Sequence, residues 1–243
     1  MYALTKWLPL APNLQELEVT MSFDRFDAYT AGPNDRIWKA AARGTTETPH
    51  FVLPTLRTLS AWAALIRNFT CPALERYVME KFTRHDKYLT DYLEFVKRSG
   101  APPSFRTLEI RSSENSPVLG YFLSTITNLL ITSPDKSIFT VFSERSQGDG
   151  VLGFVILPAL EYLEITNCRD DCLPHLSSLV TSRWDICIAH RTLKSLKLIQ
   201  CFASSPVPEL LLSPPTGGID LTQVGDNWRE IARCVNEGLL LSI

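Results

Sequence analysis

The sequence lacks any run of about 18 or more apolar residues, so it offers no candidate for a membrane-spanning helix. It also lacks a basic surplus, because 24 Lys and Arg residues stand against 26 Asp and Glu residues, a formal net charge of −2. Proteins that bind nucleic acid or anionic membranes through charge need a basic stripe, so neither partner is expected. Residues 1–10 are apolar, yet they lack the basic start and small-residue cleavage site of a signal peptide.

Motifs for common enzyme chemistry are missing as well. The sequence contains no G-x-x-x-x-G-K-[S/T], G-x-G-x-x-G, H-E-x-x-H or G-x-S-x-G segment. Its 4 histidines are scattered, and the nearest approach to a catalytic set is Cys187 with His190, which Asp185 would have to orient. That spacing is common by chance. We therefore predict no enzyme, no catalytic residue and no cofactor, with a small hydrolase as the competing class.

A repeated apolar pattern is the most informative feature that is present. Leu160, Leu163, Ile165 and Cys168 read L-x-x-L-x-L-x-x-C, and the pattern returns from Leu193 to Cys201 after 33 residues. This is the signature of a leucine-rich repeat. The alternation of apolar and polar residues predicts a strand with one buried face. A single unit cannot bury that face, whereas stacked units cover one another.

Weaker versions of the pattern divide the rest of the chain. They predict strands at 14–19, 56–61, 74–79, 105–110, 138–142 and 239–243, and helices at 1–10, 35–42, 86–99, 116–130, 171–184 and 226–238. We therefore predict an α/β leucine-rich-repeat solenoid of horseshoe shape, with a curved parallel sheet on its concave side and helices on its convex side. Residues 1–243 would form one irregular domain, with an insertion loop at about 23–51 and a Pro/Gly-rich crossing at about 204–219.

The state of the 6 cysteines follows from their places in this pattern. Cys168 and Cys201 occupy the same place in two repeats, and Cys234 lies on an apolar helical stripe. We therefore predict reduced, buried thiols in a protein of the cytoplasm or nucleus, although an even number leaves disulfide pairing open. Cys172 and His175 could extend Cys168 toward a metal site, but nothing completes a tetrahedral set, so no metal is predicted.

Strand residues between the apolar positions should point into the concave side, where a partner could bind. Aromatic and Arg side chains commonly anchor protein interfaces, and the expected face carries several of them beside charged residues. The predicted partner-binding residues are Trp62, Arg76, Arg111, Phe142, Tyr162, Glu164 and Lys197. The alternative is that irregular repeats leave some of these side chains under loops.

Three segments in order resemble a known family. They are the phrase L-P-A-L-E-Y-L-E-I at 157–165, the helix end at 179–184 with L-K-S-L at 193–196, and the ending E-G-L-L-L-S-I at 237–243. Together they resemble the leucine-rich-repeat half of the F-box proteins expanded in mushroom-forming fungi. The resemblance implies the target-recognition part of a receptor for an SCF ubiquitin ligase, with an unknown protein as target.

An F-box itself, which begins L-P-x-E-(I/L) and binds the ligase adaptor, is not visible in this sequence. We therefore expect adaptor binding only if an F-box lies upstream, and no residue here is assigned to it. The alternatives are a stand-alone leucine-rich-repeat scaffold and a truncated paralogue, neither of which would serve a ligase.

Overall fold

The computed structural model describes residues 8, 11–19, 50–61, 66, 68–79, 92, 94–111, 125–143, 145–148, 151–154, 157–184 and 191–243. The chain forms two compact units, each of which is described by itself. The first comprises Met1–Glu80 and His85–Phe105, and the second comprises Lys81–Arg84 and Arg106–Ile243. The predicted α/β class, with mostly parallel strands, is confirmed.

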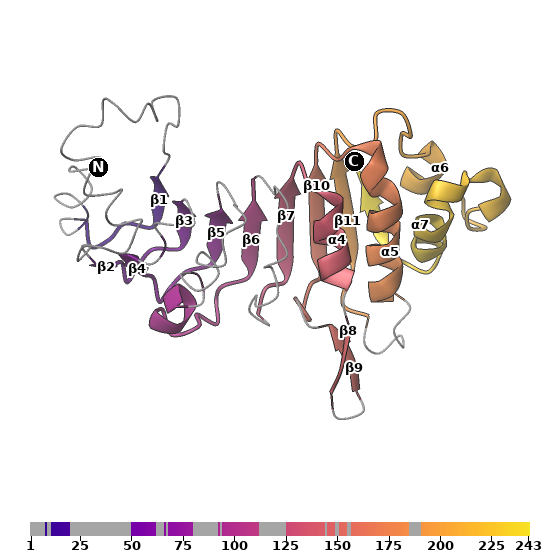
Figure 1. Ribbon diagram of the computed structural model, residues 1–243. Coiled ribbons are helices and arrows are strands. Elements are labelled where there is room, and N and C mark those ends of the chain that lie inside the picture. The colour runs from indigo at the N-terminus through magenta and orange to yellow at the C-terminus, as the bar shows by residue number, and fades with distance from the viewer. Residues whose placement is uncertain are drawn as a thin grey trace. The chain divides into compact units, whose positions relative to one another are not determined.

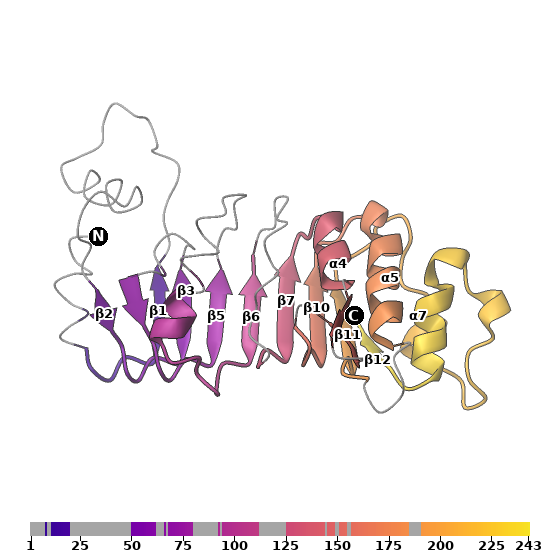
Figure 2. The same ribbon diagram turned by 60° about the horizontal axis from the view of Figure 1, so that its bottom comes forward.

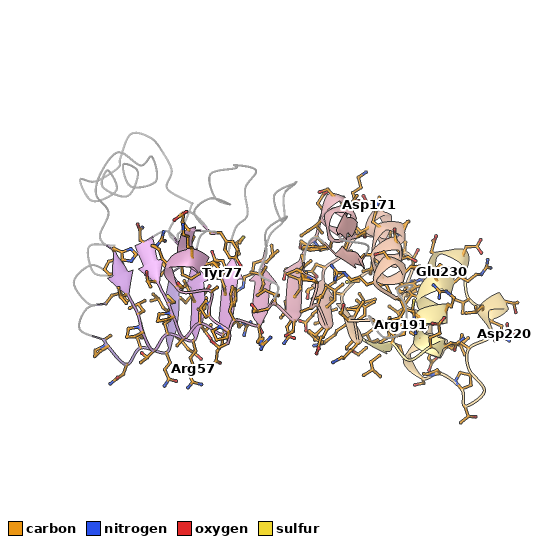
Figure 3. The ribbon with its side chains drawn as sticks, turned by 90° about the horizontal axis from the view of Figure 1, so that it is seen from below. Arg57, Tyr77, Asp171, Arg191, Asp220 and Glu230 are labelled. Carbon is orange, nitrogen blue, oxygen red and sulfur yellow. The ribbon has the colours of Figure 1, made fainter. Side chains whose placement is uncertain are left out.

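The first unit contains two sets of parallel strands. The larger set has the order β1 (Glu16–Val19), β3 (Thr58–Ala61) and β5 (Arg76–Met79), and the smaller set pairs β2 (Phe51–Val52) with β4 (Phe69–Thr70). Tyr77, labelled in Figure 3, is fully buried, and its ring lies 6.2 Å from the rings of both Tyr92 and Phe95. Residues 94–98 are helical, which agrees with the helix predicted at 86–99 over its described part.

The second unit contains a longer parallel sheet (Figure 1). Its strands lie side by side in chain order: β6 (Thr107–Ile110), β7 (Asn128–Thr132), β10 (Tyr162–Thr166), β11 (Ser195–Ile199) and β12 (Leu240–Ser242). The antiparallel pair β8 (Arg145–Gly148) and β9 (Val151–Phe154) is separate from this sheet. The register aligns Leu163 with Leu129 and Leu196, so the apolar residues of successive strands stand in rows.

Helices cover one face of this sheet. The helical segments of the unit are α4 (Lys136–Ser143), η4 (Asp170–Cys172), α5 (Leu173–Trp184), α6 (Glu209–Leu212), η6 (Leu221–Gln223) and α7 (Asp226–Asn236). Figure 2 shows α4, α5 and α7 in this order along the sheet, and α5 contacts both of the others. Between helices and strands, Leu163, Ile165 and Leu196 are completely buried.

The same proline-containing turn precedes five strands. The turns span 11–14, 53–56, 71–74, 102–105 and 157–160, each with proline at its second position. In each turn the last N–H donates to the first carbonyl at 3.0–3.3 Å. Proline suits this place because its ring fixes φ near the value that the turn needs. The turns lead into β1, β3, β5, β6 and β10.

The turn that follows three strands of the second unit also repeats. Ser133, Asn167 and Gln200 come directly after β7, β10 and β11, and their φ angles are 51°, 55° and 52°. The N–H of Ser133 donates to Thr166 at 2.8 Å, and the N–H of Asn167 donates to Ile199 at 2.9 Å. Polar residues in the left-handed region therefore end successive strands in the same way.

Two buried or half-buried hydrogen-bond networks hold the helices. The fully buried Arg183 of α5 donates to the carbonyls of Leu157 and Phe142, both at 2.9 Å. Glu237, at the end of α7, accepts hydrogen bonds from Trp184 at 2.9 Å and from Arg191. Figure 3 shows Arg191 beside α7. These bonds tie α5 to the chain before it and to α7 after it.

Two predicted elements are wrong. The segment 138–142, predicted as a strand, lies in helix α4, and Ile138, Phe139 and Phe142 form the buried stripe of that helix. The C-terminal part of the helix predicted at 116–130 is strand β7, in which Leu129 and Ile131 are buried. The strand predictions at 14–19, 56–61, 74–79, 105–110, 160–168 and 239–243 are confirmed, as are the helices at 171–184 and 226–238.

Other predictions fall outside the described residues. Almost all of the helix at 1–10, the whole helix at 35–42 and nearly all of the insertion loop at 23–51 lie there. The crossing at 204–219 contains the short helix α6 and ends where Asn236 of α7 binds Ile219. The Asn236 side chain accepts from the Ile219 N–H at 2.7 Å and donates to its carbonyl at 2.9 Å.

Candidate binding surface

The face of the second-unit sheet that the helices leave uncovered is the candidate site. On β7, β10 and β11, fully buried residues alternate with half-buried ones, so each strand turns every second side chain away from the helical layer. We call this the open face. Its residues on the four strands β6, β7, β10 and β11 are Thr107, Glu109, Asn128, Leu130, Thr132, Tyr162, Glu164, Thr166, Ser195, Lys197 and Ile199.

The register places these residues in rows across the strands. Tyr162 stands level with Asn128 and Ser195, and Glu164 stands level with Leu130 and Lys197. Neighbouring residues in a row are one strand spacing apart, about 4.8 Å, so their side chains touch. The open face is therefore a continuous surface built from segments that lie far apart in the sequence.

A three-residue cluster lies at the centre of the open face. The Tyr162 hydroxyl donates to Glu164 Oε2 at 2.6 Å, and Lys197 Nζ lies 3.4 Å from the same oxygen. Burial raises the pKa of Tyr162 to about 12, and the bond to Glu164 and that residue's charge add to the effect. The phenol therefore stays protonated at neutral pH and holds the carboxylate in place.

A second charge pair lies at the β6 side of the open face. Arg111 follows β6 directly, and its Nε donates to Glu109 Oε1 at 2.9 Å. The Glu109 side chain is 12% exposed and that of Arg111 is 41% exposed, so the cation lies outermost. Lys197, at 36%, likewise lies outside Glu164, at 19%. Between the two carboxylates, the half-buried Leu130 stands level with both.

The titratable groups of the open face are held in hydrogen bonds and ion pairs. Both named carboxylates are engaged by a cation or a phenol, and the phenol is not poised to lose its proton. No serine or cysteine of the open face has a histidine partner among the hydrogen bonds of the described residues. An apolar centre at Leu130 and Tyr162, bordered by charged pairs, has the composition of a protein interface.

The structure brings together some of the predicted partner-binding residues. Tyr162, Glu164 and Lys197 form the central cluster, and Arg111 lies at the β6 side of the same sheet. Phe142 does not lie on the open face: it belongs to α4 and is completely buried, because the helical stripe turns it into the core.

Two predicted residues remain, Arg76 and Trp62. Arg76 is a half-buried residue of β5 in the first unit. On the neighbouring strand β3 and on β5 itself, Ser60 and Val78 are 5% and 3% exposed. Trp62 lies outside the described residues.

Sequence reasoning missed the contribution of β7 to the open face. Asn128, Leu130 and Thr132 occupy the place that was given to 138–142. A signal was available, because Ile126, Leu129 and Ile131 repeat the L-x-x-L-x-L spacing. Leu130 obscured it, since an apolar residue four places after Ile126 also fits a helical stripe.

Other candidate sites contribute little within the described part of the chain. No group of three or more His, Cys, Asp or Glu residues there is arranged to hold a metal ion, and no helix there is long and apolar enough to cross a membrane. Asp185, Cys187 and His190 lie outside the described residues. No family model, curated protein or solved structure matches this chain.

Proposed function

We propose that this chain is a non-catalytic protein-binding module that holds a protein target on the open face. The observation that carries the proposal is the half-buried cluster of Tyr162, Glu164 and Lys197 beside Leu130, on the sheet face opposite the helices. The open face has an apolar centre, with two cations outermost and their carboxylates beneath them. Such a face suits a partner surface that carries both apolar and charged groups.

A leucine-rich-repeat solenoid is the architecture that we propose for the chain. The repeated proline turns, the left-handed residues after successive strands and the rows of buried leucines support it. Each is a feature of one coil that recurs in the next, as expected where stacked coils bury one another's apolar faces. This architecture makes one sheet face available along its length, which suits protein recognition.

The charge of the open face favours a protein over nucleic acid. Arg111 and Lys197 are offset by Glu109 and Glu164, so the face has no basic surplus with which to bind phosphates. The whole chain also has a formal net charge of −2. Complementary charges on the partner would fix its register on the sheet.

The test of this proposal is a binding comparison between two variants. Tyr162→Ala combined with Lys197→Glu removes the central cluster, and we expect it to reduce capture of the target by about tenfold or more, because two interface anchors are lost. Lys194→Glu is the matched control, since Lys194 is 64% exposed and pairs with Glu161 off the open face. Both variants should unfold at the same temperature as the native chain. Equal capture by the double variant and the control would remove the open face as the binding site.

We further propose that the captured target is a substrate of an SCF ubiquitin ligase, as the resemblance to F-box receptors implies. The experiment is to follow the lifetime of the captured protein in cells with and without this gene, and after inhibition of the cullin. A longer lifetime in both cases supports the receptor function. An unchanged lifetime would instead support a scaffold that binds its partner without marking it for degradation.

A further inference from the structure

Two cysteines lie side by side where β10 and β11 end. Cys168 and Cys201 each follow a left-handed residue two places beyond the strand, and backbone hydrogen bonds bracket the pair. On one side the N–H of Asn167 donates to Ile199, and on the other the N–H of Phe202 donates to Cys168, both at 2.9 Å. Adjacent strands are about 4.8 Å apart, and a disulfide spans Cα atoms about 4.4–6.8 Å apart. The backbone therefore already has the spacing that a disulfide needs.

The Cys201 sulfur lies against the backbone of Cys168, and the surroundings of the two thiols differ. The N–H of Cys168 donates to Cys201 Sγ at 3.4 Å, and the Cys168 thiol donates to the same sulfur. The bond from the Cys168 thiol lowers the pKa of Cys201 to about 7, although burial opposes the shift. The carbonyls of Ile165 and Ile199, each 3.3 Å from Cys201 Sγ, can accept its proton while it is a thiol. Cys201 is half-buried, whereas Cys168 is 4% exposed.

A third thiol lies next to Cys168 but is less suited to react first. Cys172 is completely buried, and its Sγ lies 3.7 Å from the carbonyl of Pro134 and 3.8 Å from Asp171 Oδ1. Burial, with the charge of Asp171, raises the pKa of Cys172, while Arg169 acts in the other direction. Asp171, labelled in Figure 3, lies at the start of the helical segment that leads into α5. Cys201 is thus the accessible nucleophile, and Cys168 is the neighbour placed to react with it.

We propose that Cys201 is a site of oxidation by hydrogen peroxide and that Cys168 resolves the product into a Cys168–Cys201 disulfide. In the first step the Cys201 thiolate attacks one peroxide oxygen, the O–O bond breaks, and hydroxide leaves as Cys201 becomes a sulfenic acid. In the second step the Cys168 thiol attacks the Cys201 sulfur, the S–O bond breaks, and the departing hydroxide takes the thiol proton as water. Two thiols are oxidised and one peroxide is reduced to two waters.

The disulfide would join two coils of the chain covalently just beyond the open face. Thr166 and Ile199, the last residues of β10 and β11 on that face, lie two residues before the joined cysteines. A dithiol reductant would reverse the link by thiol–disulfide exchange. The proposal does not depend on the identity of a protein target, so it stands or falls separately from the binding function.

Peptide mapping after oxidation tests the proposal directly. The folded, reduced chain is treated with hydrogen peroxide, its remaining thiols are blocked with N-ethylmaleimide, and it is digested with trypsin without reduction. The sequence places Cys168 in peptide 146–169, Cys172 in 170–183, Cys187 in 184–191 and Cys201 in 198–229. We expect peptide 146–169 linked to 198–229, and its disappearance after dithiothreitol. A link from 146–169 to 170–183 as the main product, or unmodified Cys201 under conditions that oxidise other cysteines, would overturn the proposal.

Three serine variants separate the roles of the thiols. Cys168→Ser should leave Cys201 as a sulfenic acid that dimedone traps in peptide 198–229. Cys201→Ser should abolish the link, and Cys172→Ser, the matched control, should retain it. Loss of the link in Cys172→Ser, or no dimedone adduct on peptide 198–229 in Cys168→Ser, would contradict the assignment. Because the mapping of the native chain needs no substitution, it decides the matter even if a variant fails to fold.

Discussion

Single buried polar side chains hold the helical layer of the second unit in place. Arg183 is completely buried, yet its guanidinium donates to two backbone carbonyls, those of Leu157 and Phe142. The first carbonyl opens the proline turn 157–160, and the second belongs to the buried stripe of α4. A buried charge is tolerated only when such hydrogen bonds replace those of water. Arg183 therefore fixes α5, α4 and the turn at 157–160 relative to one another. Apolar contacts alone would position these three segments less specifically.

Replacing this arginine should be costly. Arg183→Met keeps the side-chain length but removes two buried hydrogen bonds, those to the carbonyls of Leu157, which keeps its bond from the Leu160 N–H, and of Phe142, and each lost bond costs about 1–3 kcal/mol. We expect the free energy of unfolding in urea to fall by about 2–5 kcal/mol. Arg169→Met is the control, because Arg169 is 70% exposed and pairs with the exposed Asp171, so its loss should cost about 0.5 kcal/mol or less. Equal effects of the two substitutions would show that the buried bonds do not stabilise the fold.

The thiol of Cys201 should titrate near neutral pH. The thiolate is the form that reacts with iodoacetamide, and the pKa of Cys201 is lowered to about 7 by the hydrogen bond from Cys168. Its alkylation rate should therefore rise with pH and reach half of its maximum near pH 7. Cys71 is the internal control, because burial raises its pKa to about 12 and its rate should stay low throughout that range. A Cys201 rate that rises only alongside that of Cys71 would contradict the assignment.

At the scale of elements, α7 secures the irregular crossing at 204–219. Both polar atoms of the Asn236 side chain bond to the backbone of Ile219, at 2.7 and 2.9 Å, and Ile219 is 5% exposed. These two side-chain bonds take the place of the backbone hydrogen bonds that Ile219 would make in a strand or a helix. The C-terminal end of the crossing is therefore held by the Asn236 side chain, while at its other end Trp228 Nε1 donates to the carbonyl of Ser205 at 3.3 Å.

Asn236→Ala should loosen this crossing. It leaves the buried N–H and carbonyl of Ile219 without partners, and we expect a loss of about 1–3 kcal/mol in the free energy of unfolding. Amide hydrogen exchange at 213–219 should accelerate, while exchange on β10 and β11 should stay slow. Asn227→Ala, at an exposed position of the same helix, should change neither quantity. Unchanged exchange at 213–219 in the Asn236 variant would show that other contacts hold the crossing.

Strand prediction succeeded where two local signals agreed. At β5 and β10, a proline turn comes before residues whose apolar side chains recur at every second position. Both signals predict a strand, and the structure has strands there. Prediction failed where composition and capping disagreed. The segment 138–142 is rich in aromatic and β-branched residues, which favour strands. Asp135, however, accepts from the Ser137 N–H at 2.9 Å, and the first turn of α4 begins there.

At the scale of the whole molecule, the candidate surface could be predicted only in part. Tyr162 and Glu164 belong to one strand, so the period of two placed them on one face. Their contact with Lys197 depends on the register between strands that are 33 residues apart, which a sequence pattern indicates only when the repeat is regular. Leu130 could not be placed on the open face from the sequence, because its spacing from Ile126 fits a helix and strand β7 was therefore not predicted.

The central claim is that the open face of the second unit holds a protein partner. Site-specific photo-crosslinking tests it most directly, with a benzophenone amino acid placed at position 130, the half-buried centre of that face, or at position 227, on the exposed side of α7. The account predicts that one target crosslinks from position 130 and not from position 227. A target that crosslinks from position 227 and not from position 130 would contradict it.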